Sequence, residues 1–181
     1  MAYKTDINKS VLNRNNFRLV IDKVPTVEYY VRTVNIPGVQ FGETVQPAGV
    51  GLEAFFPGDK ATFDTLEVGF LVDEDLQNFV EIYNWIDSIV PLSDPELYGT
   101  FTGTAKSNTN ILQSVANDLN QYSDITLVIN TNKNLPNRYI RFHDCFPIAL
   151  GSIELESGAE AEPALVNVSF RFSYYDIADK S

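Results

Sequence analysis

Apolar and polar residues alternate along most of this chain, which is the pattern of half-buried β-strands. The alternation is clearest near the C-terminus, where Val166, Val168 and Phe170 are separated by polar residues. The pattern predicts strands over residues 16–23, 26–35, 62–72, 124–130, 138–146 and 164–175, with a shorter one over 151–155. The first two strands are expected to form a hairpin, because only the short link 23–26 joins them.

One segment has the spacing of a helix instead. Apolar residues at three- and four-residue steps predict a helix over 76–89. Three carboxylates over 73–75 precede it and suit the positive end of a helix, and Pro91 ends it. Its apolar stripe is expected to pack on the sheet, with binding of a partner as the alternative. The stripe consists of Phe79, Val80, Tyr83, Ile86 and Val90.

The other segments organise the chain into an arm and one domain. We expect an N-terminal arm over 1–15 and a single β domain over 16–181. The domain is expected to contain two long loops, a glycine-rich one over 38–61 and one rich in Thr and Asn over 96–121. The second loop has room for a short helix over 111–119.

Composition narrows the class of protein. The chain has 181 residues, of which 44% are hydrophobic and 12% aromatic, so it can bury a substantial core and is not disordered. No apolar run approaches the roughly 20 residues of a membrane-spanning helix, and the polar start is unlike a signal peptide. We therefore expect no membrane span. Cys145 is the single cysteine, so we expect no internal disulfide and synthesis in a reducing cytoplasm.

Negative charge is concentrated in the middle of the chain. There are 24 Asp and Glu against 13 Lys and Arg, giving a net charge of −11. Residues 33–105 contain twelve carboxylates and one cation, 1 − 12 = −11, whereas the first 32 residues contain six cations and three carboxylates, 6 − 3 = +3. Tight binding of nucleic acid requires clustered cations, so this balance excludes a conventional nucleic-acid-binding protein.

The sequence offers little for catalysis. His143, the single histidine, precedes Asp144, but neighbouring residues of a strand point to opposite faces and do not pair. Cys145 shares the face of His143, yet such neighbours are about 7 Å apart, too far for a relaxed hydrogen bond. We expect a structural role, with Cys145 as a small buried hydrophobe. One His and one Cys cannot build a usual zinc site. We therefore expect no enzyme, no cofactor, and no catalytic, cofactor-binding or metal-ligating residue.

Short motifs, in the order of these elements, resemble one protein family. They are Asn-Phe-Arg-Leu-Val-Ile at 16–21, Ile-Pro-Gly at 36–38, Pro-Gly-Asp-Lys-Ala-Thr-Phe-Asp at 57–64, Phe-His-Asp-Cys-Phe-Pro at 142–147 and Phe-Arg-Phe-Ser-Tyr-Tyr-Asp at 170–176. An acidic turn and a helix ending near Trp85 lie between the third and the fourth. Over nearly the whole chain, the sequence resembles the tail tube proteins of contractile-tailed bacteriophages.

The resemblance implies a mainly β fold of two packed antiparallel sheets with one flanking α-helix, a sandwich that becomes part of a barrel on assembly. It implies a structural protein of the virion tail, made in the host cytoplasm. Six subunits would form a ring, and rings would stack into a tube that conducts DNA without binding it specifically. The tail sheath and the baseplate or tail-terminator proteins would be further partners. A baseplate tube initiator and an injection-machine tube are related alternatives.

A competing interpretation from another class is a monomeric β-sandwich binding module, for example for carbohydrate. It requires an exposed aromatic platform. The candidates are Tyr29, Tyr30, Tyr174 and Tyr175. Packing in the core or between subunits is the favoured use of these rings.

If strands 62–72 and 164–175 contribute to an inner barrel, each has one face in the core and one in the lumen. The core faces consist of Leu66, Val68, Phe70, Val72, Val166, Val168, Phe170 and Phe172. The candidate lumen-facing residues are Thr65, Glu67, Asn167, Ser169, Arg171 and Ser173. An ordinary outer surface is an equal alternative for these residues. We also expect at least one long loop to order against a neighbouring subunit, and the basic first 32 residues to meet the acidic segment of an adjacent ring.

Overall fold

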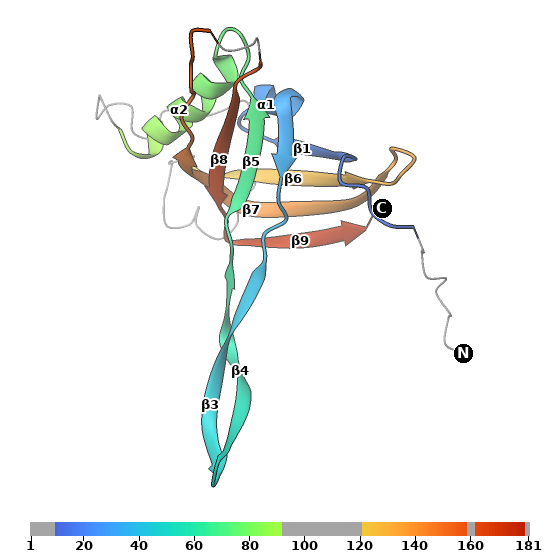
Figure 1. The fold of residues 1–181 in the computed structure, drawn as a ribbon, viewed down its shortest axis with the longest axis vertical. Coiled ribbons are helices and arrows are strands. Elements are labelled where there is room, and N and C mark those ends of the chain that lie inside the picture. The colour runs from blue at the N-terminus through green and yellow to red at the C-terminus, as the bar shows by residue number, and fades with distance from the viewer. Residues whose placement is uncertain (1–9, 92–120, 159–161, 180–181) are drawn as a thin grey trace.

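The computed structural model describes residues 10–91, 121–158 and 162–179. Within these ranges the chain forms nine strands and two helices (Figure 1). In chain order they are β1 (Phe17–Ile21), α1 (Pro25–Tyr30), β2 (Val31–Val34), β3 (Val39–Gly49), β4 (Leu52–Phe63), β5 (Leu66–Leu71), α2 (Gln77–Ile89), β6 (Ser123–Asn130), β7 (Pro136–Leu150), β8 (Leu165–Arg171) and β9 (Tyr174–Asp179).

The body consists of two antiparallel sheets that share β7. Sheet I has the order β1-β6-β7-β9 and sheet II the order β7-β8-β5-β2. The first part of β7 pairs with β6 and β9, and Phe146–Leu150 pairs with β8. Asp144, at a φ of 56°, interrupts the extended backbone where β7 passes from one sheet to the other. This arrangement confirms the expected fold of two packed sheets.

The core lies between the two sheets. Leu19, Ile125 and Phe142 from sheet I and Val68 and Phe170 from sheet II are buried in one cluster. Helix α2 covers part of this cluster, since the Trp85 ring lies 5.8 Å from the Phe170 ring. The Trp85 Nε1–H donates to the carbonyl of Gln121 at 2.8 Å, so its polar atom is satisfied in the core. None of the helices in the described ranges is long and apolar enough to cross a bilayer.

Several expected elements are confirmed. Strands β1 and β5 lie within 16–23 and 62–72, β6 and β7 cover the expected 124–130 and 138–146, and α2 covers all of the expected helix 76–89 except residue 76. The strand expected over 164–175 is divided into β8 and β9, which pair with different parts of β7. Ser173 lies between them, and its N–H donates to the carbonyl of His143 at 2.9 Å. The strand expected over 151–155 does not form.

The expectation for residues 26–35 is half wrong. Pro25–Tyr30 form the helix α1, with Pro25 in its first turn, where the missing N–H costs nothing. Val27 on α1 is fully buried, so packing outweighs the strand preference of this segment. The expected hairpin with 16–23 is also wrong, because β1 pairs with β6 and β2 pairs with β5.

The loop expected over 38–61 is a long hairpin instead. Strands β3 and β4 pair from Val39–Phe63 to Gly49–Leu52 and project from the body as an arm (Figure 1). We call this segment the hairpin arm. Residues 96–120 and the short helix expected over 111–119 lie outside the described residues, and so do residues 1–9 of the expected N-terminal arm. The division into an arm and a single domain stays a prediction.

Helix α2 buries a different face from the one expected. Its buried positions include Asn78, Ile82 and Trp85, whereas Val80 and Tyr83 are about half exposed. Asn78 is polar, but it can be buried on this face because its side chain donates to the carbonyl of Leu71 at 2.8 Å. Of the predicted stripe, Phe79 and Ile86 pack against the core only in part, and Val90 is exposed. Asp73 does accept a hydrogen bond from the Asn78 N–H, as expected for a carboxylate before the helix.

Candidate functional site

The outer face of sheet II carries a polar cluster centred on Glu67. Glu67 on β5 lies opposite Ser169 on β8. The Ser169 hydroxyl donates to Glu67 Oε2 at 2.7 Å, and the Thr65 hydroxyl donates to Glu67 Oε1 at 2.9 Å. The backbone N–H of Glu67 donates to Asn35 Oδ1 at 2.7 Å, just after β2. Two strands and the end of a third thus fix the position of one exposed carboxylate.

Three strands approach closely beside this cluster. Gly69 on β5 lies opposite Asn167 on β8 and Thr33 on β2. A methyl group at Gly69 would lie 2.8 Å from Asn167 Oδ1 and closer still to Thr33 Oγ1. The lack of a side chain at Gly69 therefore lets Thr33 and Asn167 share the outer face.

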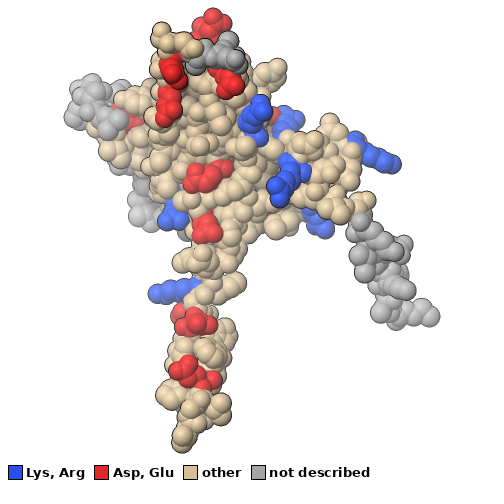
Figure 2. Space-filling model, in the orientation of Figure 1, with Lys and Arg blue, Asp and Glu red and all other residues tan. Residues whose placement is uncertain are grey.

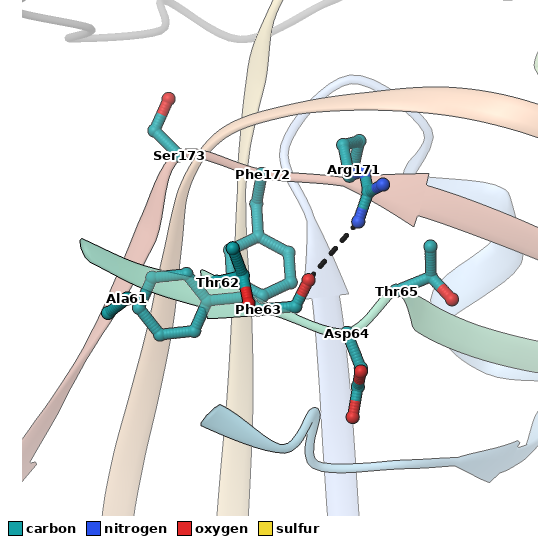
Figure 3. Close-up of a pocket in the computed structure, with 8 residues that line it drawn as sticks. All are labelled: Ala61, Thr62, Phe63, Asp64, Thr65, Arg171, Phe172 and Ser173. Carbon is teal, nitrogen blue, oxygen red and sulfur yellow. Dashed lines mark hydrogen bonds between the residues drawn. The ribbon is translucent and has the colours of Figure 1, made fainter. Parts of the chain in front are cut away.

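An open cavity of about 780 Å³ lies where the hairpin arm joins the body (Figure 3). Arg171 Nη1 donates to the carbonyl of Phe63 at 3.1 Å and thereby links the end of β8 to the end of β4. Arg171 itself is exposed. The cavity is lined by Ala61, Thr62, Phe63, Asp64, Thr65, Arg171, Phe172 and Ser173.

The structure brings most of the candidate lumen-facing residues together. Thr65, Glu67 and Ser169 are joined by hydrogen bonds, and Asn167 lies on the same face of β8 as Ser169. Arg171 extends this row to the end of β8, and Ser173 lies beyond the strand. The opposite faces are core, as expected: Leu66, Val68, Phe70, Val166, Val168, Phe170 and Phe172 are buried, and Val72 is half-buried. That the polar face borders a lumen stays a prediction.

Thr33 and Asn35 belong to the same face but are not among the residues predicted from sequence. The predicted hairpin with 16–23 would place their segment in sheet I. The alternation of Thr33, Val34 and Asn35 was the available signal, because it continues the period-two pattern beside β5.

Sheet II has two edges without a partner strand in the part of the chain that the structure describes. There β2 pairs only with β5, and Phe146–Leu150 pairs only with β8. Unpaired backbone groups at such edges favour pairing with another chain. Ile148, in a β-bulge at the second edge, is half exposed.

The hairpin arm is a second candidate surface for contact with another protein. Almost all of its residues are exposed, and among them Phe41, Leu52 and Phe55 are large apolar side chains with 63–73% exposure. An isolated two-stranded hairpin is marginally stable in water. Large apolar side chains exposed in this number mark an interaction site.

His143 and Cys145 have structural surroundings. His143 Nε2 lies 2.7 Å from Asp176 Oδ1 on β9, and its ring stacks on Tyr174. Cys145 is fully buried, as expected, and burial, with a smaller effect of the Asp124 charge, raises the pKa of its thiol. A thiol with a raised pKa remains protonated and is a poor nucleophile. The part of the chain that the structure describes contains no group of three or more His, Cys, Asp or Glu residues that could hold a metal ion.

A family model described as phage tail tube protein matches residues 3–178. The chain belongs to the phage tail tube protein family. It is therefore a structural tube subunit of a virion tail, in agreement with the resemblance found in the sequence. No curated protein sequence matches it.

Solved structures show the same fold at low sequence identity. A chain of the anti-feeding prophage cap, described as a tube terminating cap, is 13% identical with a TM-score of 0.63, covering 99% of this chain and 100% of that one. A chain of an extracellular contractile injection system, the PVC sheath-tube complex, is 12% identical with a TM-score of 0.59, covering 95% and 94%. A chain of the anti-feeding prophage baseplate, 6-fold symmetrised, is 6% identical with a TM-score of 0.56, covering 96% and 97%.

The four tyrosines proposed as a binding platform do not lie together in this tail tube protein. Tyr29 and Tyr30 are on α1, with ring centroids 5.1 Å apart, whereas Tyr174 and Tyr175 are on β9, which lies away from α1 (Figure 1). Tyr175 packs against Phe142 and is half-buried. The four rings therefore do not form the aromatic platform that the carbohydrate-binding alternative requires.

Proposed function

We propose that the chain forms hexameric rings that stack into a tail tube, with the outer face of sheet II lining a channel for DNA. The single observation that carries the proposal is sheet II itself. It combines a polar face fixed by its own hydrogen bonds, an apolar face in the core and two open edges. A sheet of this kind is suited to join copies of itself into a closed barrel.

Pairing of the two edges of sheet II between neighbouring subunits would close the ring. The free side of β2 in one subunit would pair with Phe146–Leu150 of the next, so that sheet II continues from subunit to subunit. Such a contact joins two different surfaces, and repetition by rotation closes a ring without leaving an open edge. The anti-feeding prophage baseplate, which contains a chain of the same fold, is six-fold symmetrised, and this supports six subunits.

The polar face has the charge that a channel for DNA requires. Glu67 is negative, Asn167 and Ser169 are neutral, and the Arg171 guanidinium is anchored on a carbonyl. Phosphates are retained by clustered cations, which this face lacks. DNA would therefore pass without specific binding.

Further partners follow from the same assignment. We expect the tube to contact the tail sheath along its length and a baseplate or tail-terminator protein at its ends, because the fold occurs in a sheath-tube complex, a cap and a baseplate. Assembly in the host cytoplasm would suit the single reduced cysteine.

Substitution of lumen residues by cations tests the proposal. Phage particles with Glu67→Lys and Ser169→Lys are expected to assemble full-length tails yet eject DNA several-fold more slowly, because the added ammonium groups attract passing phosphates. The delay should be larger at low salt, where the attraction is less screened. Ejection is measured by the release of labelled DNA after addition of receptor.

Gln77→Lys and Asn84→Lys on α2 provide the control, because both positions are exposed and lie outside sheet II. These particles should eject at the normal rate. Normal ejection by the Glu67→Lys, Ser169→Lys particles with intact tails would place the polar face of sheet II outside the channel.

A further inference from the structure

We propose that the hairpin arm of one subunit docks in a groove of another copy of this chain, the groove formed by Arg14, Tyr29 and Arg32. The inference rests on the proposed stacking of rings and names the two surfaces that meet. Four observations support it: the residue pattern on one face of the arm, the chemistry of the groove, the positions of the two surfaces in the fold, and their opposite charge.

One face of the arm has a defined pattern of side chains. Directly opposed residues of an antiparallel pair have their side chains on the same face. The register places Val45 opposite Phe55, with Glu43 one pair before and Glu53 one pair after on this face. The arm therefore presents an apolar pair between two carboxylates that are about 13 Å apart along the strands.

The described part of the subunit leaves this face of the arm exposed. Phe55 is 63% exposed and Val45 is 45% exposed, and both carboxylates are exposed. Among the described residues, neither Glu43 nor Glu53 has a hydrogen bond or ion pair. A surface of this composition is stabilised when another protein covers it.

The groove has the complementary chemistry. It is an open cavity of about 710 Å³ between β1, α1, β2 and the end of β5. Tyr29, 86% exposed, lies in it with Arg14 and Arg32, and Val31 and Leu71 add apolar surface. In the described part of the chain Arg14 and Arg32 have no carboxylate partner, whereas the nearby Arg18 is paired with Glu28 at 2.5 Å. Figure 2 shows cationic side chains beside α1 and β1 and carboxylates along the arm.

The arm and the groove lie at opposite ends of the β2–β5 pair. Val31 and Phe70 are paired at the groove end, and Val34 and Val68 are paired toward the arm. The arm extends away from the body (Figure 1) and thus away from its own groove. Within one subunit the two surfaces are therefore kept apart, but in a row of subunits the arm of one copy points toward the groove end of the next.

Charge and apolar surface then favour a second copy over other occupants. Arg guanidinium groups pair with carboxylates by two parallel hydrogen bonds, and Arg14 and Arg32 would flank the bound arm as Glu43 and Glu53 flank its apolar pair. Tyr29 would cover the Val45–Phe55 pair. The contact joins different surfaces of identical chains and therefore propagates along a stack.

Reversal of the charges tests the pairing. Glu43→Arg with Glu53→Arg, or Arg14→Glu with Arg32→Glu, should each shorten the polymers by at least ten-fold in negative-stain images and in sedimentation. The variant that combines all four substitutions should restore polymer length. Gln46→Arg and Lys133→Glu are controls, because Gln46 is exposed on the other face of the arm and Lys133 lies on the body outside the groove, and they should leave length unchanged.

A cross-link identifies the contact directly. Val45→Cys with Tyr29→Cys should form oxidised ladders of covalent multimers, and each single variant should not. Multimers that fail to form in assembled protein, charge reversal without effect, or no restoration by the fourfold variant would each overturn the proposed docking. A covalent bond within one subunit would also overturn it.

Two further measurements distinguish the proposed docking from the proposed function and from binding of DNA in the groove. Protein that forms no rings or tubes at all contradicts the proposed function itself, whereas rings that form and stack normally despite the charge reversals contradict only the docking. Gel-shift assays with duplex DNA test the other anionic occupant. Binding of DNA that Arg14→Glu and Arg32→Glu abolish, in chains that still stack, would assign the groove to nucleic acid instead.

Discussion

Lys23 is the residue whose burial has the clearest energetic consequence. It is only 3% exposed, its Nζ lies 5.3 Å from the centre of the Trp85 ring, and burial lowers its pKa to about 8. The ordinary pKa of a lysine is 10.5. The folded protein therefore releases this proton at a lower pH than the unfolded chain does.

The shift predicts how stability depends on pH. Between about pH 8 and 10.5 the unfolded chain holds a proton at Lys23 that the folded protein has lost, so the contribution of Lys23 to the free energy of unfolding rises with pH. Lys23→Met removes this contribution. The difference in free energy of unfolding between Lys23→Met and the wild type should thus change by roughly 1.4 kcal/mol per unit of pKa shift across that window, to the disadvantage of the variant. Urea denaturation at pH 7, 8.5 and 10 measures it, and a difference that is constant with pH would contradict the prediction.

At this scale the sequence predicts the alternation of single side chains well. Every expected core residue of β5 and β8 is buried, because a strand pattern of period two has only one consistent orientation. The partners of polar residues are harder to predict. Glu67 accepts from Ser169 and from Thr65, and His143 meets Asp176, but the contacts with Ser169 and Asp176 depend on which strands pair, which the alternation does not contain.

At the scale of elements, α2 shows why a helical period can point to the wrong face. The apolar stripe expected from spacing includes Val80 and Tyr83, which are exposed, while Asn78 and Ser88 are buried. Asn78 and Ser88 donate to backbone carbonyls, so their polar atoms are satisfied inside. Counting apolar residues alone could not find this face.

Two truncations on α2 distinguish its faces. Ile82→Ala should lower the free energy of unfolding by about 2 to 5 kcal/mol, because it deletes buried methylene groups and leaves a cavity. Val80→Ala, at a position 45% exposed, should change it by less than about 1 kcal/mol. Chemical denaturation of the isolated subunit makes the comparison. Equal effects would mean that the expected stripe packs inward after all.

The sequence does not predict the strands of the hairpin arm, because it shows neither apolar alternation nor an uninterrupted run of strand-forming residues there. Both of its faces are exposed, so no apolar alternation is required, and glycines interrupt it. At Gly58 the glycine is needed, since a methyl group would lie 2.6 Å from the carbonyl oxygen of Gly42 on the facing strand. Glycines are typical of loops, but in a strand they also occur where two backbones approach closely. The glycines of this segment therefore predicted a loop although the segment forms two strands.

Gly58 and Gly42 form a matched pair for testing the arm. Gly58→Ala should disturb the pairing of β3 with β4 and increase amide hydrogen exchange over residues 39–63 by several-fold, because the backbone contact cannot relax by a rotamer change. Gly42→Ala should leave exchange unchanged, since no atom lies within 4 Å of the added methyl group. Global stability should be similar in both, because the arm lies outside the core. Identical exchange in the two variants would count against the close contact.

At the scale of the whole molecule, two electrostatic effects oppose each other during assembly. Each chain carries −11, so rings repel one another at long range. The proposed arm contact joins opposite charges at hydrogen-bond distance instead. At 0.1 M salt the Debye length is about 10 Å, so diffuse repulsion between rings is already screened while a contact pair is not. We therefore expect the local attraction to dominate near physiological salt.

This balance predicts the direction of salt dependence. Raising NaCl from about 0.1 M to about 1 M should shorten stacks, since the Debye length falls to about 3 Å and the Arg–carboxylate pairs weaken. Single rings should persist, because pairing of sheet II edges relies on uncharged backbone groups. The variant with all four charges reversed should show the same dependence, because every contact pair keeps its opposite signs. Stacks that lengthen with salt in both proteins would show that repulsion between the −11 chains, and not the arm contact, controls the assembly of the tube.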